Sequence, residues 1–165
     1  MHYLSGALLL AQVALMWVLN ASIDVMGHQY LAWAVWLGSA ILLVVSMLTL
    51  RSKGQVQAGR SCVETEVLVA TGVYGVVRHP MYLGWILMHI AMVLFKPNWM
   101  IAILGIAGAA CVYLFTVQEE ARLCEQYGES YGSYMRAVPR FNLLAGTIRL
   151  FLKRGAEDRG TPLQG

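Results

Sequence analysis

Charged residues are scarce in this sequence. Only 13% of its 165 residues are charged and 58% are hydrophobic, whereas a typical soluble domain is about 25% charged. That composition argues against a soluble globular domain and for an integral membrane protein. The chain also lacks a basic stripe with interleaved aromatic residues, so we expect no nucleic-acid partner. Its net charge of +3 is small, and where the charges lie is more informative than their sum.

Cysteine is scarce as well. The three cysteines, Cys62, Cys111 and Cys124, have neither the spacing of metal ligands nor the even number of a disulfide framework. We therefore expect structural roles for them and no metal site. The first apolar run follows Met1 and His2 without a basic segment, and no small-residue cleavage pattern follows it. We interpret this run as a retained helix rather than a signal peptide.

Long apolar runs dominate the rest of the chain. A membrane-spanning helix needs about 20 largely apolar residues, and four runs approach or reach that length. The predicted fold class is an all-α integral membrane protein with about four transmembrane helices. The expected spans cover residues 4–20, 30–50, 81–95 and 99–117.

The segment between the second and third spans is apolar but broken. Residues 67–77 are interrupted by Gly72 and Gly75, so they are too short to cross a bilayer. Non-helical backbone at membrane depth must be buried in protein or line a cavity. We therefore expect a re-entrant or interfacial segment here.

The C-terminal third has a polar, helical pattern in which Gly128 is a candidate helix breaker. Residues 141–154 are amphipathic, which is typical of a helix that lies on an anionic membrane surface. We predict one domain over residues 1–154 and a disordered tail over residues 155–165.

The distribution of basic residues predicts the topology. With four spans, residues 51–80 and all residues after 117 lie on one side, which receives eleven Lys and Arg residues, and the other side has only Lys96. The positive-inside rule then places both termini and the C-terminal helical region in the cytoplasm. The eleven residues are Arg51, Lys53, Arg60, Arg78, Arg122, Arg136, Arg140, Arg149, Lys153, Arg154 and Arg159.

Polar groups collect at this cytoplasmic border. The stretch from Gly72 to Tyr82 combines an arginine, an imidazole and two tyrosines, and the pair Glu119-Glu120 lies on the same side. Polar groups at a membrane border are costly unless they bind something. Pro80 suits the first turn of a helix, whose N-terminus attracts anions. The set could hold a zwitterionic, aromatic small molecule. In the alternative interpretation Arg78 is an ordinary basic flank and the glutamates form a solvated helix end.

Three sequence blocks carry a family resemblance. They are Gly-Val-Tyr-x-x-x-Arg-His-Pro-x-Tyr-x-Gly at residues 72–84, Glu-Glu-x-x-Leu-x-x-x-x-Gly-x-x-Tyr-x-x-Tyr at residues 119–134, and Val-Pro-Arg at residues 138–140. In this order and spacing they resemble the isoprenylcysteine carboxyl methyltransferases, whose wider group includes the membrane phospholipid N-methyltransferases. The resemblance covers residues 64–141. It implies an integral membrane enzyme that uses S-adenosylmethionine.

The resemblance also implies binding roles for individual residues. Methyl transfer from a sulfonium depends mainly on alignment of donor and acceptor, so we assign no covalent catalytic residue. His79 is expected to hydrogen-bond the cofactor, and Glu119 to accept a bond from a cofactor hydroxyl or amino group. The expected cofactor-binding residues are Glu66, Val67, Leu68, Val69, Tyr74, His79, Pro80, Met81, Tyr82 and Glu119, with Glu120 as the weaker member of its pair.

The acceptor side departs from the prenylcysteine enzymes. Those enzymes carry an arginine about one turn before the Glu-Glu pair to meet the substrate carboxylate, whereas residues 113–117 here contain none. The acceptor therefore stays open between a prenylcysteine-like carboxylate, a phospholipid amine, a small thiol and another lipid. The residues considered for the substrate side or a lid are Arg78, His89 and Arg140.

His89 has a structural interpretation too. It lies inside the third span, where an ionisable residue is a functional candidate, yet the sequence shows no partner for it and we expect an interhelical hydrogen bond. Two alternatives to the methyltransferase also remain. One is an NADPH-dependent membrane reductase of the sterol reductase type, which has a similar Arg-His-x-x-Tyr block. The other is a non-enzymatic membrane scaffold, which would bind no cofactor. The oligomeric state stays open.

Overall fold

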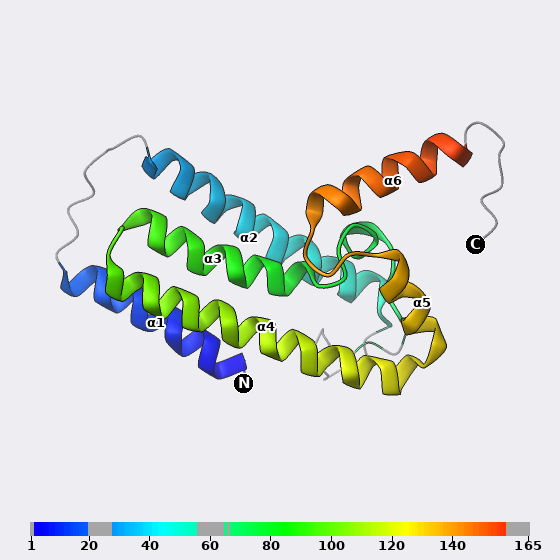
Figure 1. Ribbon diagram of the computed structural model, residues 1–165, viewed down its shortest axis with the longest axis horizontal. Coiled ribbons are helices and arrows are strands. Elements are labelled where there is room, and N and C mark those ends of the chain that lie inside the picture. Colours follow the sequence, from blue (N-terminus) through cyan, green and yellow to red (C-terminus); the bar gives the residue numbers. More distant parts are fainter. Residues whose placement is uncertain (1, 20–27, 56–64, 66, 158–165) are drawn as a thin grey trace. The chain divides into compact units, whose positions relative to one another are not determined.

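The computed structural model describes residues 2–19, 28–55, 65 and 67–157, and all the regular secondary structure in these ranges is helical (Figure 1). The predicted all-α class is therefore confirmed for the described part of the chain. The elements are α1 (His2–Val18), α2 (His28–Lys53), the short 3-10 helix η1 (Gly72–Gly75), α3 (Pro80–Phe95), α4 (Trp99–Tyr127), α5 (Glu129–Ala137) and α6 (Leu143–Glu157).

Local sequence signals explain several helix boundaries. Helix α3 begins at Pro80, as expected from the fixed backbone angle and missing N–H of proline. Asn98 caps α4, because its side-chain oxygen accepts a bond of 2.9 Å from the backbone N–H of Met100. The polar residues after 117 continue α4 without a break, and the helix ends where Gly128 adopts a left-handed φ of 57°. The predicted break at Gly128 is confirmed.

Two helices are long and apolar enough to cross a membrane. They comprise residues Gln29–Lys53 and Trp99–Tyr127, with 25 and 29 residues. The apolar helices Tyr3–Val18 and Pro80–Phe95 are shorter than a full span. The helices thus indicate a membrane protein with two candidate spans, and the count of four stays a prediction.

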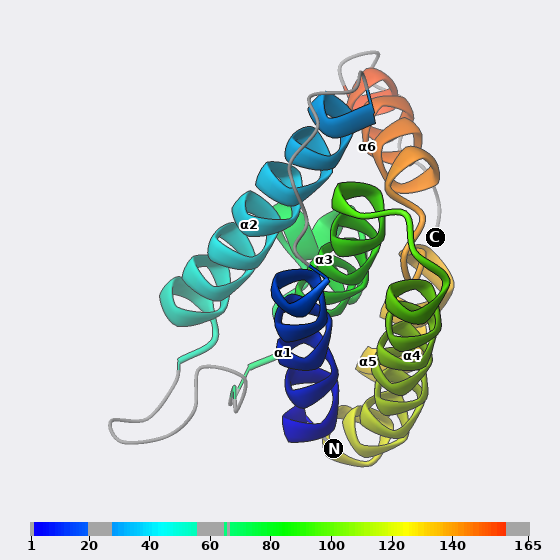
Figure 2. The same cartoon turned by 90° about the vertical axis from the view of Figure 1, so that its left-hand side faces the viewer.

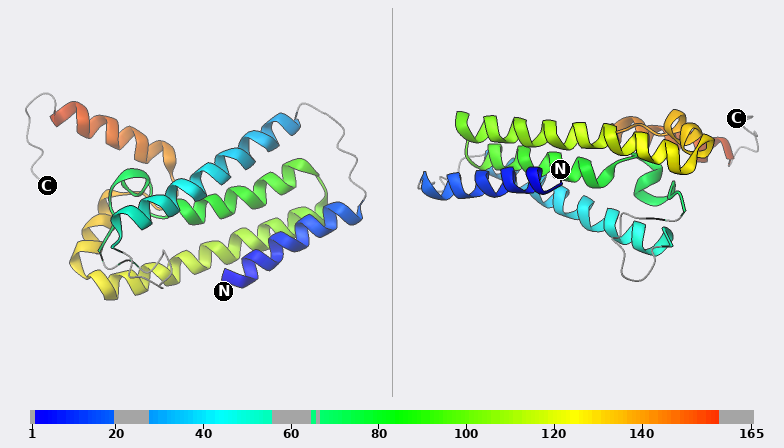
Figure 3. Two further views of the ribbon diagram at one scale, coloured as in Figure 1. Left: turned by 180° about the vertical axis from the view of Figure 1, so that it is seen from behind. Right: turned by 90° about the horizontal axis from the view of Figure 1, so that it is seen from below.

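The described chain divides into two compact units. Unit 1 contains residues 1–45 and 81–123, and α3 makes contacts with each of its other helices. Ser39 of α2 donates a hydrogen bond of 2.7 Å to the backbone carbonyl of Gly84 in α3. The rings of Trp33 and Phe95 join the same two helices at 4.9 Å. Figure 2 shows α3 between its neighbours, and Figure 3 shows α1 alongside α4.

Unit 2 contains residues 46–80 and 124–165. Its described residues include the end of α2, the loop with η1, the end of α4, and α5 and α6. The segment 67–77, expected to be re-entrant or interfacial, is irregular apart from η1, and it buries Val69, Tyr74 and Val77. Helix α6 continues to Glu157, so the tail predicted from residue 155 is helical over its first three residues. Its remainder, residues 158–165, lies outside the described residues, as do Cys62 and most of the polar loop before Thr65.

Candidate functional site

The predicted site residues are divided between the two units. The boundary falls between Pro80 and Met81, inside the His-Pro-x-Tyr block. Unit 2 holds the loop residues, Arg140 and the buried residues Tyr74, His79 and Pro80. Unit 1 holds Met81, Tyr82, His89, Glu119 and Glu120. Glu66 lies outside the described residues.

The loop in unit 2 turns sharply before it reaches His79. Gly72 has a left-handed φ of 65°, which a residue with a side chain rarely adopts. The carbonyl of Val73 then accepts bonds from the N–H groups of Val76 and Val77, each at 3.1 Å. Among the loop residues predicted to border the cofactor, Val67 is exposed, Leu68 is half-buried and Val69 is buried. The N–H groups of Val76 and Val77 are thus satisfied within the loop itself.

The residues before α3 pair with the Val-Pro-Arg segment. The N–H of Arg78 donates to the carbonyl of Pro139 at 2.9 Å, and the N–H of His79 donates to the carbonyl of Arg140 at 3.4 Å. The His79 ring lies 6.3 Å from the Phe141 ring, measured between centroids. Two of the three motif blocks are therefore in direct backbone contact.

Helices α5 and α6 hold the preceding turn. The Tyr134 hydroxyl donates to the carbonyl of Tyr74 at 2.6 Å, and the Arg149 guanidinium donates to the carbonyl of Gly75 at 2.5 Å. A hydrogen bond from a charged donor is about twice as strong as a neutral one. At Gly146, any Cβ would overlap the backbone carbonyl of Val76, so α6 can approach this closely only with glycine at that position.

Five C-terminal residues thus contact the backbone of residues 74–79, and we call them the C-terminal clamp. They act from three different elements: α5, the extended segment and α6. Because they contact backbone atoms, they determine the loop's shape without depending on the identity of its side chains. The members are Tyr134, Pro139, Arg140, Gly146 and Arg149.

The clamp tyrosine is held in its neutral form. Tyr134 is buried, and its ring lies 5.8 Å from that of Tyr131, which is 1% exposed. Burial raises the pKa of the Tyr134 phenol well above its usual range, and the neighbouring Tyr131 and Tyr74 raise it further. Tyr134 therefore remains a hydrogen-bond donor at every physiological pH. Tyr131 and Tyr134 thus pack against each other within the C-terminal region.

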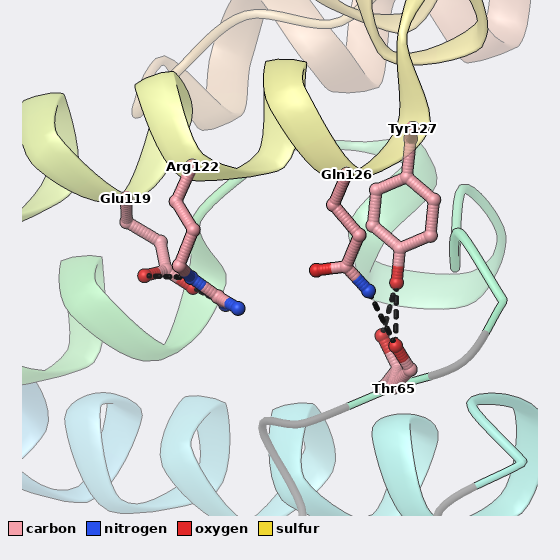
Figure 4. Close-up of polar contacts among 5 residues, drawn as sticks. All are labelled: Thr65, Glu119, Arg122, Gln126 and Tyr127. Atoms are coloured by element: carbon pink, nitrogen blue, oxygen red, sulfur yellow. Dashed lines mark hydrogen bonds and ion pairs between the residues drawn. The ribbon is translucent and has the colours of Figure 1, made fainter.

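The start of the loop has its own anchor. The hydroxyl of Tyr127 donates to the carbonyl of Thr65 at 2.6 Å, and the Gln126 side chain donates to the same carbonyl at 3.1 Å (Figure 4). Further along, Lys53 donates to the Thr71 hydroxyl at 2.9 Å. These contacts hold the ends of the segment that the resemblance places beside the cofactor.

In unit 1 the first turn of α3 packs against α4. Tyr82 is buried, and its ring lies 5.6 Å from Phe115 in an edge arrangement. Glu119 follows Phe115 by four residues, so it lies one turn further along the same face of α4. The structure therefore brings Tyr82 close to the turn of α4 that precedes the Glu-Glu pair.

Glu119 has a partner that sequence reasoning missed. Arg122 binds both oxygens of its carboxylate, with Nε to Oε2 at 3.1 Å and Nη2 to Oε1 at 2.5 Å (Figure 4). The Glu119 side chain is 14% exposed and the Arg122 side chain 49%. A carboxylate has about four acceptor sites, so Glu119 can accept further bonds while it is paired. Glu120 is more buried than Glu119, at 4% exposed. The spacing of three residues on a helix was the available signal for the pair.

His89 belongs to a closed network among α1, α3 and α4. Gln12 donates from its amide nitrogen to the carbonyl of Ile101 at 3.0 Å, so its oxygen accepts from His89 Nδ1 at 2.6 Å. The other ring nitrogen, Nε2, then accepts from the Ser5 hydroxyl at 3.2 Å. A Cβ at Gly108 would overlap the imidazole. The expected interhelical hydrogen bond is confirmed, and its partners Ser5 and Gln12 were missed.

Comparisons with known proteins agree with the motif blocks. The phospholipid methyltransferase family model matches residues 27–130. The chain belongs to the phospholipid methyltransferase family. The match covers all of α2, α3 and α4, and it includes Tyr74, His79 and Glu119. Membership confirms the family predicted from the three blocks.

Two curated proteins that are similar to this chain are protein-S-isoprenylcysteine O-methyltransferases. The chain is 34% identical to the Rattus norvegicus protein over 119 residues, which cover 63% of this chain and 40% of the relative. It is 36% identical to the Homo sapiens protein over 80 residues, which cover 46% of this chain and 27% of the relative. The chain therefore spans less than half of the length of either relative. No solved structure gives a significant match.

Proposed function

We propose that this protein transfers a methyl group from S-adenosylmethionine to a hydrophobic or membrane-associated acceptor. The observation that carries the proposal is the C-terminal clamp. It holds the backbone of residues 74–79, the segment that the family motif predicts to border the cofactor, through contacts from α5, α6 and the Val-Pro-Arg segment. A binding segment held in advance loses little entropy when the ligand arrives.

The residues present suit S-adenosylmethionine. Glu119 offers carboxylate oxygens to cofactor hydroxyl or amino groups, and buried Tyr74 and Tyr82 offer aromatic surface. His79 offers an imidazole beside Phe141. When bound, the cofactor supplies the methyl group from its sulfonium. The residues of this chain bind it, orient it and exclude water, and such positioning lowers a barrier by about 7–11 kcal/mol.

The acceptor is proposed to be apolar and to enter from the bilayer. Residues 113–117 of α4 contain no arginine, and Tyr113, Leu114 and Val117 are exposed apolar side chains. A prenylcysteine carboxylate would therefore lack the basic partner that the prenylcysteine enzymes use. A lipid or another small hydrophobic acceptor suits this surface better. To identify the acceptor, the protein is incubated with radiolabelled S-adenosylmethionine and host membranes. The labelled product is then identified.

The proposed topology has about four spans, formed by α1 to α4, with both termini in the cytoplasm. The eleven basic residues on one side support this arrangement. It places the loop and the Glu-Glu pair on the cytoplasmic face, where a soluble cofactor has access.

Calorimetry of the purified protein tests the proposal. S-adenosylmethionine and S-adenosylhomocysteine are expected to bind and NADPH is not, and binding of NADPH alone would indicate the reductase alternative. Glu119→Gln and His79→Ala should each weaken S-adenosylhomocysteine binding by about tenfold or more, the loss expected for a charge-assisted hydrogen bond. Glu125→Gln removes an exposed carboxylate from the same helix and is the matched control. Unchanged affinity in both site variants would overturn the assignment.

A further inference from the structure

Helix α6 exposes a continuous apolar stripe. Leu144, Ile148, Phe151 and Leu152 are 77%, 59%, 70% and 68% exposed. Their spacing of four, three and one residues places them on one face of the helix. No element among the described residues covers this face.

The other side of α6 is committed to the loop. Gly146 packs against the Val76 carbonyl, and Arg149 donates to the Gly75 carbonyl. The first two turns of α6 therefore lie on the clamped segment, and its later turns lead away from it (Figure 1). Any partner that binds the apolar stripe thus binds a helix that directly supports residues 75–76.

The charge of α6 indicates which partner fits. The helix carries Arg149, Lys153 and Arg154 against a single acidic residue, Glu157. A basic amphipathic helix with large apolar side chains on one face binds anionic membrane surfaces. A second copy of the chain would bring two equally basic helices together, and their repulsion makes that partner less favourable.

We propose that α6 docks on an anionic membrane surface, with this stripe at the boundary of headgroups and acyl chains and its basic residues attracted to the lipid charge, and that docking stabilises the loop conformation that binds the cofactor. The second half rests on the proposed function, whereas the first half does not. Lipid charge would then regulate cofactor affinity through a helix that contacts the backbone of the motif. By linkage, the bound cofactor would strengthen the docking of α6 by the same factor.

Spin labels on the full-length protein test the docking. A nitroxide is attached at Ile148→Cys, on the stripe, or at Lys153→Cys, on the opposite side, after Cys62, Cys111 and Cys124 are replaced by serine. The protein is placed in lipid nanodiscs of phosphatidylcholine alone or of an equimolar mixture with phosphatidylglycerol. In the anionic discs the label at 148 should become accessible to oxygen and protected from a water-soluble relaxant, while the label at 153 stays accessible to the relaxant. Equal accessibility at both positions, or dipolar broadening between two copies, would overturn lipid docking.

The charge contribution has a matched pair of variants. With the label at 148, Lys153→Gln should lower the ratio of docked to undocked helix by up to about fivefold, the full effect of one basic residue close to an anionic surface. Arg136→Gln removes an exposed basic residue from α5 in the same unit and should leave that ratio unchanged. An equal effect of both substitutions would show that the whole unit, rather than α6, responds to lipid charge.

Calorimetry in the same nanodiscs tests the coupling. Unlabelled wild-type protein should bind S-adenosylhomocysteine about fivefold or more tightly in the anionic discs, within the usual range of coupling between sites. Ile148→Ser combined with Phe151→Ser should abolish this difference while binding in phosphatidylcholine is retained. Equal affinity of the wild type in both discs would overturn the coupling. Absence of binding in either disc would instead overturn the cofactor proposal, and the spin labels would still decide whether α6 docks.

Discussion

Buried polar side chains serve different purposes in the two units. In unit 1, Ser5 and Gln12 of α1 each bond to one imidazole nitrogen of His89 in α3, and Gln12 also donates to a backbone carbonyl of α4. In unit 2, Tyr134 and Arg149 bond instead to backbone carbonyls of the loop that carries the family motif. The first network satisfies itself and holds helices together. The second determines the shape of a segment that is expected to bind a ligand.

The comparison corrects a common inference about membrane proteins. A histidine inside an apolar helix is a functional candidate by default, and His89 is the most conspicuous such residue in this chain. Its partners nevertheless make it a structural residue. Gly146 gives a much weaker sequence signal, yet it lies directly against the backbone of the first motif block. Proximity to the motif backbone is therefore a better guide to functional support than residue type.

The largest effect should come from closing the space at Gly146. Gly146→Ala places a Cβ on the Val76 carbonyl, so α6 must move and the bond from Arg149 to Gly75 is strained or lost. Overpacking costs about 1–3 kcal/mol. We expect S-adenosylhomocysteine affinity to fall by at least about fivefold, since each 1.4 kcal/mol is tenfold in affinity. Calorimetry provides the measurement.

Gly132→Ala in α5 is the matched control, because its nearest neighbour would be the flexible end of Arg136 at 3.8 Å. That substitution should leave affinity unchanged. If the two alanine variants bind equally well, the clamp does not shape the binding segment and the comparison between the units fails.

The next largest effect is a loss of stability when the hydrogen-bond network around His89 is broken. Ligand affinity should not change. Gln12→Leu strands His89 Nδ1–H in a buried site and removes the second bond to the Ile101 carbonyl, which keeps its partner within α4. An unsatisfied buried group costs about 1–3 kcal/mol, so the free energy of unfolding in detergent should fall by about that amount. The double variant Gln12→Leu/His89→Leu should be less destabilised than the sum of the single variants, because the two residues share one interaction. A large loss of S-adenosylhomocysteine affinity in Gln12→Leu would instead show that the His89 network supports the site.

Much of the fold follows from local sequence signals. The apolar runs predict α1 to α4, Pro80 predicts the start of α3, and Gly128 predicts the end of α4. The sequence predicts a span that ends at residue 117, followed by a polar helical region, because the hydrophobic pattern ends there. Helix propensity continues past residue 117, and α4 extends ten residues further, to Tyr127. After residue 117 the residues still favour a helix although they are no longer apolar, and the backbone therefore remains helical.

The parts that could not be predicted are contacts between distant residues. His89 and Gln12 are 77 residues apart, and nothing in either apolar run identifies the other as its partner. The clamp was equally hidden, since Tyr134 and Arg149 bind backbone carbonyls, which every residue possesses. The motif blocks contain Tyr134, Pro139 and Arg140 but not the atoms that these residues contact. Gly146 inside an amphipathic helix was a further signal, because a glycine there indicates a close approach of another backbone.

A smaller change sharpens the role of the clamp. Tyr134→Phe removes only the hydroxyl that donates to the Tyr74 carbonyl and leaves the ring in place. The loss of one hydrogen bond should lower the free energy of unfolding by about 0.5–1.5 kcal/mol and weaken S-adenosylhomocysteine binding by a similar energy. Tyr30→Phe, at an exposed position on α2, is the control and should be neutral in stability. Loss of stability without any loss of affinity would assign Tyr134 to packing alone.

The smallest effect is a loss of stability at alkaline pH that depends on Tyr134. Burial raises the pKa of this phenol in the folded protein, so the contribution to stability is complete below the unfolded-state pKa and declines as pH rises above it. With an unfolded-state pKa of about 10, the loss at pH 10 is about 0.4 kcal/mol and grows towards 1.4 kcal/mol per pH unit above it. The free energy of unfolding of the wild type and of Tyr134→Phe is measured by denaturation between about pH 8 and about pH 10.5. Over this range only the wild type should show the loss that comes from the phenol of Tyr134. If the two curves stay parallel throughout, the surroundings of Tyr134 do not hold its phenol neutral. The clamp of unit 2 would then lack the electrostatic environment that keeps its tyrosine a hydrogen-bond donor.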